Sequence, residues 1–238
     1  MRTDHRMTAR NPLKAPVIGM VCAGFGKTQD ADGKDGLPTI AKLSTMRMGV
    51  RADEPGVVVS DYSTAGGGEY SGMRERMVIG KKDRVRDEYK VFGMDGKQGK
   101  HPEVFYKYFI QDASFLVGLE GDDDIVDSSA EAIRKPKWQT YLGRKKFMSW
   151  IPLFGGVVER RLEDALRGEP WLIRTLEELS VAPARRLPDK VRYVIECERG
   201  QGYPVRDVPI SFDFKSPRSF GTRYVREEFG AVPDSGER

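Results

Sequence analysis

Alternating apolar and polar side chains predict the first strands of this chain. Residues 44–53 place apolar side chains at every second position, which is the period of a strand with one buried face. Residues 57–62 predict a second strand, and Pro55–Gly56 between them predicts a short turn that joins the two as an antiparallel pair. Residues 105–119 are rich in β-branched and aromatic side chains and predict a strand pair or one long bent strand.

Helices are predicted where the alternation stops. An apolar run with an opening proline and closing glycines predicts a buried helix over residues 15–26. An aspartate-rich start, a basic end and a proline stop predict a helix over residues 124–135. Short helices are predicted over residues 162–167 and 170–179.

The alternation returns near the end of the sequence. Residues 191–198, 205–214 and 223–229 predict three strands separated by glycine and proline turns. Arg218, Arg223 and Arg226 in this region either extend a cationic surface or are charges at its rim.

Residues 64–104 interrupt the pattern. This segment is rich in glycine, has no helical period, and is longer than an ordinary loop of a compact domain. Between residues 71 and 110 there are ten Lys or Arg against six Asp or Glu. We interpret the segment as a protruding basic hairpin that a polyanionic partner would order.

Charge is segregated along the chain. The net charge is only +4, but residues 120–131 hold six carboxylates and no Lys or Arg. Six of the thirteen residues in 134–146 are then basic and none is acidic, with Trp138 and Tyr141 among them. This combination suits a polyanion that also offers stacking faces, and Gly143 permits a turn from which Arg144, Lys145 and Lys146 project. The alternative is a solvated basic loop.

A second basic group precedes the first predicted helix. Arg6, Arg10 and Lys14 lie beside a helix N-terminus, where unsatisfied amides favour an anion such as phosphate, although they could also only solubilise a tail. Asp122–Asp124 lack the spacing of a calcium loop, so neither a metal nor a cofactor is predicted. Cys22 and Cys197 do not form a CxxC pair, and no apolar run is long enough to span a membrane, so we expect a cytoplasmic protein.

Several motifs resemble one family. Residues 141–146 (YLGRKK) and 152–154 (PLF) resemble the "YLGRKS...PL" signature of the CasD subunit of type I-E CRISPR Cascade. Other blocks resemble the family in order: residues 6–19, residues 61–68 (DYSTAGGG), residues 106–119, residues 205–212 (VRDVPISF) and residues 224–228.

The resemblance implies an α+β fold, with a ferredoxin-like β-α-β-β-α-β domain over residues 1–153. Residues 64–104 would be its basic hairpin thumb, and residues 154–238 a smaller C-terminal region of helices and strands. The implied role is a non-catalytic scaffold subunit of the antiviral ribonucleoprotein, which binds the 5′ handle of crRNA, packs on the CasC backbone and touches the large subunit CasA. The RNA-binding residues implied by the matching motifs are Arg6, Lys14, Tyr106, Lys107, Tyr141, Gly143, Arg144, Lys145 and Lys146.

The resemblance has one departure and leaves alternatives open. The family's first strand ends in a Gly-Pro-x-Gln-x-Trp-Gly segment that does not precede Arg2, so we expect a compensating strand or partner contact. Type I-C relatives cut pre-crRNA without a metal, which requires an acid and a base. His5 and His101 are the two histidines and neither is obviously preorganised, so a non-enzymatic role is predicted, with metal-independent cleavage as the alternative. A generic RNA-binding domain is the third hypothesis.

Overall fold

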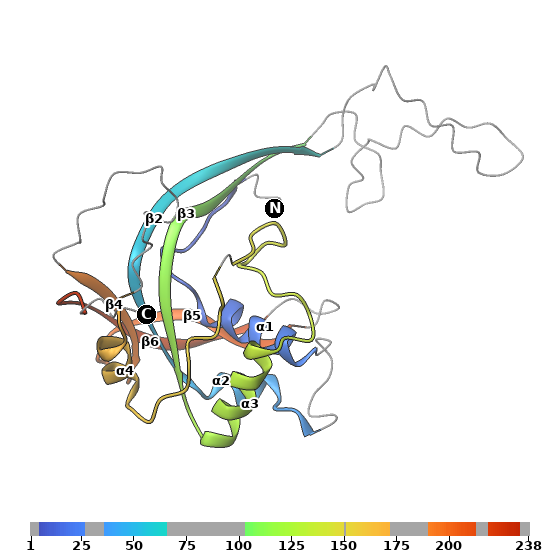
Figure 1. Cartoon of the computed structure of the whole chain (residues 1–238). Coiled ribbons are helices and arrows are strands. Elements are labelled where there is room, and N and C mark those ends of the chain that lie inside the picture. Colours follow the sequence, from blue (N-terminus) through green and yellow to red (C-terminus); the bar gives the residue numbers. More distant parts are fainter. Residues whose placement is uncertain are drawn as a thin grey trace, which may run out of the picture. The chain divides into compact units, whose positions relative to one another are not determined.

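The computed structural model describes residues 5–26, 36–65, 103–149, 151–171, 190–212 and 219–233. The elements in chain order are β1 (His5–Arg6), α1 (Lys14–Phe25), α2 (Ile40–Ser44), β2 (Arg47–Ala65), β3 (Glu103–Glu120), α3 (Asp123–Arg134), α4 (Leu162–Gly168), β4 (Val191–Cys197), β5 (Tyr203–Ser211) and β6 (Ser219–Gly230) (Figure 1). They divide into two compact units. Unit 1 comprises Met1–Thr8 and Gly56–Asp112, and unit 2 comprises Ala9–Pro55 and Ala113–Arg238.

Each unit contains part of one sheet, because β2 and β3 run through both. In unit 1 the strand order is β1-β3-β2, with β1 parallel to β3. In unit 2 the order is β3-β2-β4-β6-β5, and β4, β6 and β5 join β2 through antiparallel pairs. The succession β1-α1-β2-β3-α3 with β1 parallel to β3 fits the predicted ferredoxin-like start.

Helices cover both faces of the sheet in unit 2. Helices α1, α2 and α3 share one apolar core, which includes Ile18, Leu43 and Ile125. Helix α4 buries Leu162 and Leu166 against Val191, Tyr193 and Ile195, the odd-numbered side chains of β4. Because side chains of a strand alternate between faces, the even-numbered residues of β4, including Glu196, face the α1 side.

The predicted helix ends are confirmed. Helix α1 stops at Gly26, which adopts the left-handed conformation (φ 67°) that a side chain would disfavour. Helix α3 begins with Asp123 and Asp124 in its first turn and ends just before Pro136. Helix α4 agrees with the prediction over residues 162–167, whereas residues 172–179 of the next predicted helix lie outside the described part of the chain.

The predicted turn at Pro55–Gly56 is wrong. Strand β2 continues through both residues to Ala65, so residues 57–62 extend the same strand and lie next to β3. Gly56 has a φ of 67°, and one left-handed residue bends a strand locally without reversing it. Strand β3 is likewise one long strand, within which Asp112 adopts a left-handed conformation (φ 53°).

Gly56 and Asp112 also mark the limits of unit 1 in the two strands. The predicted division after residue 153 does not coincide with these limits, because β4 hydrogen-bonds to β2 and so belongs to the same unit as the earlier strands. Most of the predicted thumb, residues 66–102, lies outside the described residues, and this part includes His101. The first strand expected from the resemblance is represented by β1, two described residues that pair with Tyr106 and Lys107.

Candidate nucleic-acid interface

The most basic part of the sequence folds into a closed turn, which we call the glycine loop (residues 141–147). The backbone N–H of Leu142 donates to the carbonyl of Phe147 (2.7 Å), and the N–H of Phe147 donates to the carbonyl of Arg144 (2.9 Å). Gly143 has a φ of 79° and its missing Cβ would meet nothing within 4 Å. Glycine is therefore required here by the backbone conformation and not by crowding.

The chain before the glycine loop is attached to the end of α1. The backbone N–H groups of Lys137 and Trp138 donate to the carbonyls of Gly24 (2.9 Å) and Ala23 (3.1 Å). These carbonyls belong to the last turn of α1, where carbonyls lack the usual helical partners, and that of Ala23 also accepts from the N–H of Gly26 (3.0 Å). The end of α1 therefore fixes the position of residues 137–138, from which the chain continues into the glycine loop.

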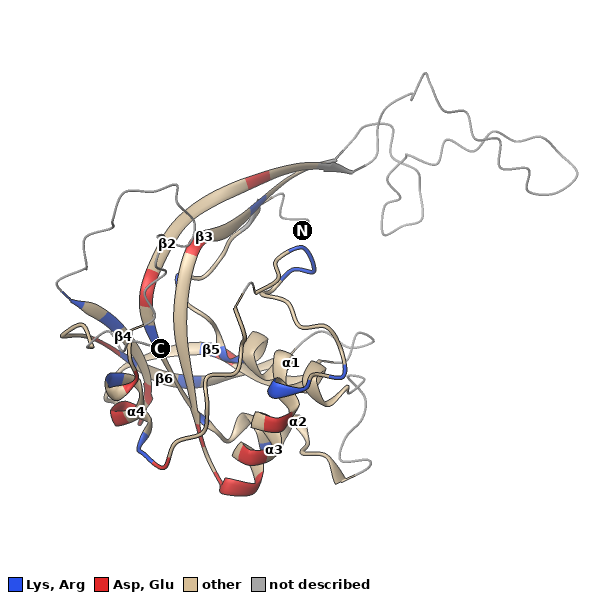
Figure 2. Ribbon diagram, in the orientation of Figure 1, with Lys and Arg blue, Asp and Glu red and all other residues tan. Residues whose placement is uncertain are grey.

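Two cations of the glycine loop lie beside an aromatic ring. The Arg144 guanidinium lies 5.9 Å and the Lys146 ammonium 5.2 Å from the centre of the Phe147 ring, and Lys145 is exposed. No Asp or Glu occurs between Glu131 and Glu159 in the sequence, and Figure 2 shows basic residues without acidic ones along this loop. Tyr141 and Trp138 are also exposed. The loop therefore presents positive charge and stacking faces together.

The predicted anion site at the start of α1 is wrong for Lys14. Its side chain is only 1% exposed, and its ammonium pairs with Glu196 Oε2 at 3.0 Å. The backbone N–H of Lys14 donates to Asp207 Oδ2 (2.8 Å), so the protein's own carboxylate occupies the helix N-terminus. Burial lowers the pKa of Lys14 below 10.5, although the charge and hydrogen bond of Glu196 oppose this shift. Lys14 is not placed to contact RNA.

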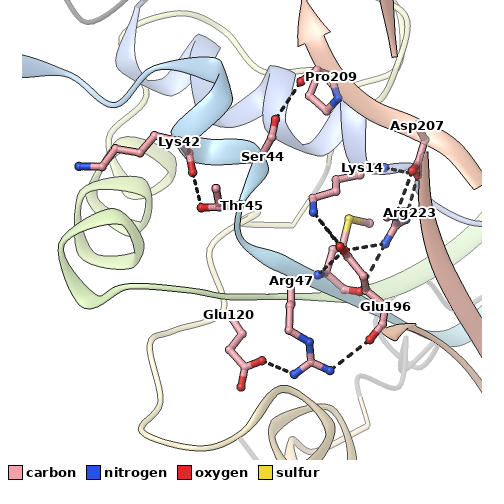
Figure 3. Close-up of polar contacts among 11 residues, drawn as sticks. Lys14, Lys42, Ser44, Thr45, Arg47, Glu120, Glu196, Asp207, Pro209 and Arg223 are labelled. Carbon is pink, nitrogen blue, oxygen red and sulfur yellow. Dashed lines mark hydrogen bonds and ion pairs between the residues drawn. The ribbon is translucent and has the colours of Figure 1, made fainter. Parts of the chain in front are cut away.

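Arg223 completes this buried network (Figure 3). Its guanidinium donates to Asp207 Oδ1 (2.7 Å) and to Glu196 Oε2 (3.2 Å). Burial alone would lower the pKa of Arg223, but the hydrogen bond and charge of Asp207 outweigh it and raise the pKa. Arg223 therefore neither extends a cationic surface nor lies at its rim. The partly exposed Arg226 lies 3.5 Å from Glu163. Arg218 lies outside the described residues. Arg10 is exposed, and its backbone carbonyl accepts a hydrogen bond from Arg192.

Unit 1 contains an aromatic group, which we call the tyrosine cluster (His5, Tyr62, Tyr106 and Tyr108). The His5 ring stacks on Tyr106 with centroids 5.0 Å apart and planes 8° from parallel, and Tyr108 lies 6.2 Å from the same ring. Tyr62 contacts the edge of Tyr106 at 5.6 Å. Sequence reasoning missed His5 as a member, because a two-residue strand has no periodicity and only its pairing with β3 brings the ring to Tyr106.

Tyr106 and Lys107 do not share a face of β3. Tyr106 points with Tyr108 toward His5, whereas the Lys107 ammonium lies 5.8 Å from the ring of Phe105, two positions away. These two residues therefore present a stacking ring and a cation on opposite faces of the strand. Of Arg6 the structure describes the backbone alone, which pairs with Lys107.

A polar depression in unit 2 is lined by more acidic than basic residues, in contrast to the basic glycine loop. Five carboxylates and three guanidiniums line it, and the residues are Arg47, Glu120, Arg161, Glu163, Asp164, Glu196, Cys197, Glu198, Gln201 and Arg226. Burial would raise the pKa of Glu163, but the hydrogen bond from Arg47 outweighs it and holds the pKa below 4.5. Its excess of negative charge makes this depression unsuitable for a phosphate backbone.

Within the described ranges, no group of three or more His, Cys, Asp or Glu residues is arranged to hold a metal ion. None of the helices in that part of the chain is both long and apolar enough to cross a bilayer. Neither Cys22 nor Cys197 is in a disulfide.

Comparison with known proteins identifies the family. The model named Cas5d, which describes CRISPR-associated proteins of the Cas5 type, matches residues 1–226. This chain belongs to the Cas5 family. The resemblance found from the motifs is thus confirmed for the family. The family is compatible with the predicted ferredoxin-like fold.

Two solved structures resemble this Cas5 protein over almost its whole length. A chain of a CRISPR RNA-guided surveillance complex is 26% identical with a TM-score of 0.68, and the match covers 98% of this chain and 84% of that one. A solved Cas protein is 28% identical with a TM-score of 0.63, and the match covers 98% of this chain and 90% of that one. The search of curated proteins gave no significant match.

Proposed function

We propose that this Cas5 protein is a non-catalytic RNA-binding subunit of a type I-E CRISPR surveillance complex, where it holds the 5′ handle of crRNA and caps the CasC backbone. The observation that carries the proposal is the glycine loop, a closed turn in which Arg144 and Lys146 lie beside the Phe147 ring, Lys145 is exposed, and no acidic residue is nearby in sequence. Cations grouped at a turn of this kind bind phosphate oxygens at close range.

The surrounding chain supports an RNA ligand over an isolated phosphate. Tyr141 and Trp138 are exposed on the same basic segment, so bases can stack while the cations contact the backbone. The tyrosine cluster of unit 1 offers further aromatic surface for unpaired bases. The family and the similar chain from an RNA-guided complex support crRNA and other Cas subunits as partners.

The type I-E branch and the partners CasC and CasA are supported by the motifs, of which residues 141–146 are the most specific. The matching family model bears the Cas5d name, which belongs to type I-C. Co-expression of this protein with the other subunits of its complex distinguishes a crRNA-specific subunit from a generic RNA-binding domain. A uniform guide-length crRNA bound to the assembled complex supports the proposed role, whereas a mixture of RNAs indicates a generic RNA-binding domain.

Salt dependence of handle binding tests the glycine loop directly. Arg144→Ala with Lys145→Ala should weaken binding of a 5′ handle RNA and reduce the slope of log K against log salt by about 0.7 for each lost phosphate contact. Fluorescence anisotropy of labelled RNA over a salt series measures the slope. Lys42→Ala with Arg199→Ala removes two exposed cations elsewhere in unit 2 and serves as the matched control. An unchanged slope in the loop variant contradicts phosphate contact at the loop.

Metal-independent cleavage of pre-crRNA is the second candidate, and the His5–Tyr106 stack favours it. Acid–base cleavage needs ionisable groups held in place, and β1 holds the imidazole of His5 against two tyrosines. Incubation of the purified protein with repeat RNA and excess EDTA tests this activity. A product that His5→Ala abolishes without loss of RNA affinity supports the enzyme, and an intact RNA supports the scaffold.

A further inference from the structure

Three cations lie between the body of α3 and the glycine loop, and they differ in their partners. Arg134 and Lys135 both pair with Glu131 of α3, at 3.3 Å and 3.4 Å. The Arg134 guanidinium also covers the ring of Phe154 at 4.6 Å. Lys137 is exposed, and within the part of the chain that the structure describes no carboxylate forms an ion pair with it. Of the three, Lys137 is therefore the cation whose charge is available to a ligand.

The stem of Lys137 is nevertheless packed in place against the end of α1. A Cβ added to Gly26 would lie 2.9 Å from the Cβ of Lys137, 3.6 Å from its Cγ and 3.0 Å from its Cδ. The methylene groups of this lysine thus lie along the glycine, where any side chain would collide with them. A stem that is already packed loses less rotamer freedom when its ammonium binds a partner.

The backbone at this position is fixed as well. Hydrogen bonds from the N–H groups of Lys137 and Trp138 to the carbonyls of Gly24 and Ala23 attach both residues to α1. Gly24 in turn allows α1 to approach α3 closely, because an added Cβ would overlap the carbonyl oxygen of Ala132. The Trp138 side chain is 46% exposed beside this fixed backbone. A cation and an aromatic side chain are therefore adjacent on a segment that two helices hold.

We propose that Lys137 is a further RNA-binding residue, which contacts a backbone phosphate next to a base stacked on Trp138, and that Gly26 positions it. This inference rests on the proposed function, because it takes RNA as the ligand of the basic segment that continues into the glycine loop. Lys137 precedes Arg144 by seven positions, so the contact extends the interface from the loop toward the end of α1. An ammonium beside an exposed aromatic ring suits a single strand, which offers a phosphate and an unpaired base together.

The salt dependence of RNA binding tests Lys137 in the full chain. Lys137→Ala should lower the slope of log K against log salt for labelled 5′ handle RNA by about 0.7, the value of one phosphate contact to a single strand. Lys135→Ala removes the same charge two positions away, from a lysine already paired with Glu131, and should lower the slope by less than half as much. Lys42→Ala, at an exposed lysine of α2, is the control and should leave the slope unchanged. Fluorescence anisotropy over a salt series measures all three.

Two glycine variants test the positioning role. Gly26→Ala and Gly36→Ala place a side chain at nearly the same backbone angle, φ 67° and 71°, but the added Cβ meets Lys137 at Gly26 and open space at Gly36. Both variants carry the cost of the left-handed backbone, and only Gly26→Ala should weaken RNA binding severalfold. Combined with Lys137→Ala, its effect should be less than additive, since both changes act on one contact. Equal RNA affinities of the two glycine variants, or full additivity with Lys137→Ala, would overturn the positioning role.

The results for Lys137 and for the glycine loop separate this inference from the proposed function. An unchanged slope for Lys137→Ala, while Arg144→Ala with Lys145→Ala lowers it, overturns the inference and leaves the proposed function standing. An equal reduction by Lys135→Ala also overturns it, because a general field of the basic segment would then explain both. If Lys137→Ala lowers the slope and the loop variant does not, the contact at Lys137 stands and the glycine loop is not the RNA contact.

Discussion

Two sets of basic residues in unit 2 have opposite surroundings. Lys14, Arg51 and Arg223 are buried, whereas the cations of the glycine loop, Arg144, Lys145 and Lys146, are partly or fully exposed. Each buried cation lies against a carboxylate of the same unit. A buried charge neutralised in this way holds the fold together and exerts little field outside, so only the second set is suited to a polyanion.

Arg51 illustrates the first set. Its guanidinium pairs with Asp53 (2.5 Å) and donates to the carbonyls of Leu166 (2.7 Å), Glu169 (2.6 Å) and Pro170 (2.9 Å). These carbonyls lie at the end of α4 and just beyond it, where the helix has no partners of its own. One arginine of β2 therefore fixes the chain that leaves α4. Its role is structural, and Asp53 and Glu54 follow it within three positions, whereas the sequence around the loop has no acidic residue.

The largest effect should come from breaking the buried set. Asp207→Asn removes the charge that faces Arg223 and weakens the acceptor for the N–H of Lys14. Because Glu196 would then be the one carboxylate of this network facing two buried cations, we expect a loss of roughly 3–5 kcal/mol in the free energy of unfolding. Urea denaturation measures it. Glu198→Gln, at an exposed carboxylate, is the control and should change stability by less than about 0.5 kcal/mol. A similarly small change for Asp207→Asn would show that the network does not stabilise the fold.

A smaller effect should come from the shape of the exposed set. Gly143→Ala places a side chain at a φ of 79°, where an L-residue costs on the order of 1–2 kcal/mol, although nothing lies within 4 Å of the added Cβ. The loop should relax to another conformation and lose handle RNA affinity, while the cations themselves remain. Gly155→Ala, which also meets open space but has no positive φ, is the control. Equal RNA affinities for the two variants would contradict a role for the turn geometry.

The smallest effect should come from a partly exposed pair that lies between these extremes. The hydrogen bond from Arg47 holds the pKa of Glu163 below 4.5, so the carboxylate stabilises the folded state above that pH. This contribution is lost as the pH falls through the folded-state pKa. Wild type should therefore exceed Glu163→Gln in stability by less than about 1 kcal/mol near neutral pH, and the difference should vanish in acid. Denaturation curves from about pH 3 to about pH 7 measure it; a constant difference would contradict the assigned pKa.

Much of the local structure could be predicted from the sequence. Glycine at 26 and proline at 136 mark helix ends because each acts through its own backbone, and the alternation in β4 reflects the buried face that holds Val191, Tyr193 and Ile195. The glycine loop was predicted for the same reason, since Gly143 and the basic run around it are neighbours in sequence. The turn at Pro55–Gly56 was predicted wrongly because the same dipeptide fits a bend within a strand, and only the pairing partners of β2 decide between them.

The sequence by itself determined where the chain turns, where its helices end and which loop concentrates positive charge, because these properties depend on residues a few positions apart. The tertiary structure alone decided which cations are neutralised and that His5 joins Tyr106. Lys14 and Glu196 are 182 positions apart in the chain, and His5 reaches Tyr106 only through the parallel pairing of β1 with β3. Contacts over such separations follow from the order of strands in the sheet, which no short pattern of side chains encodes.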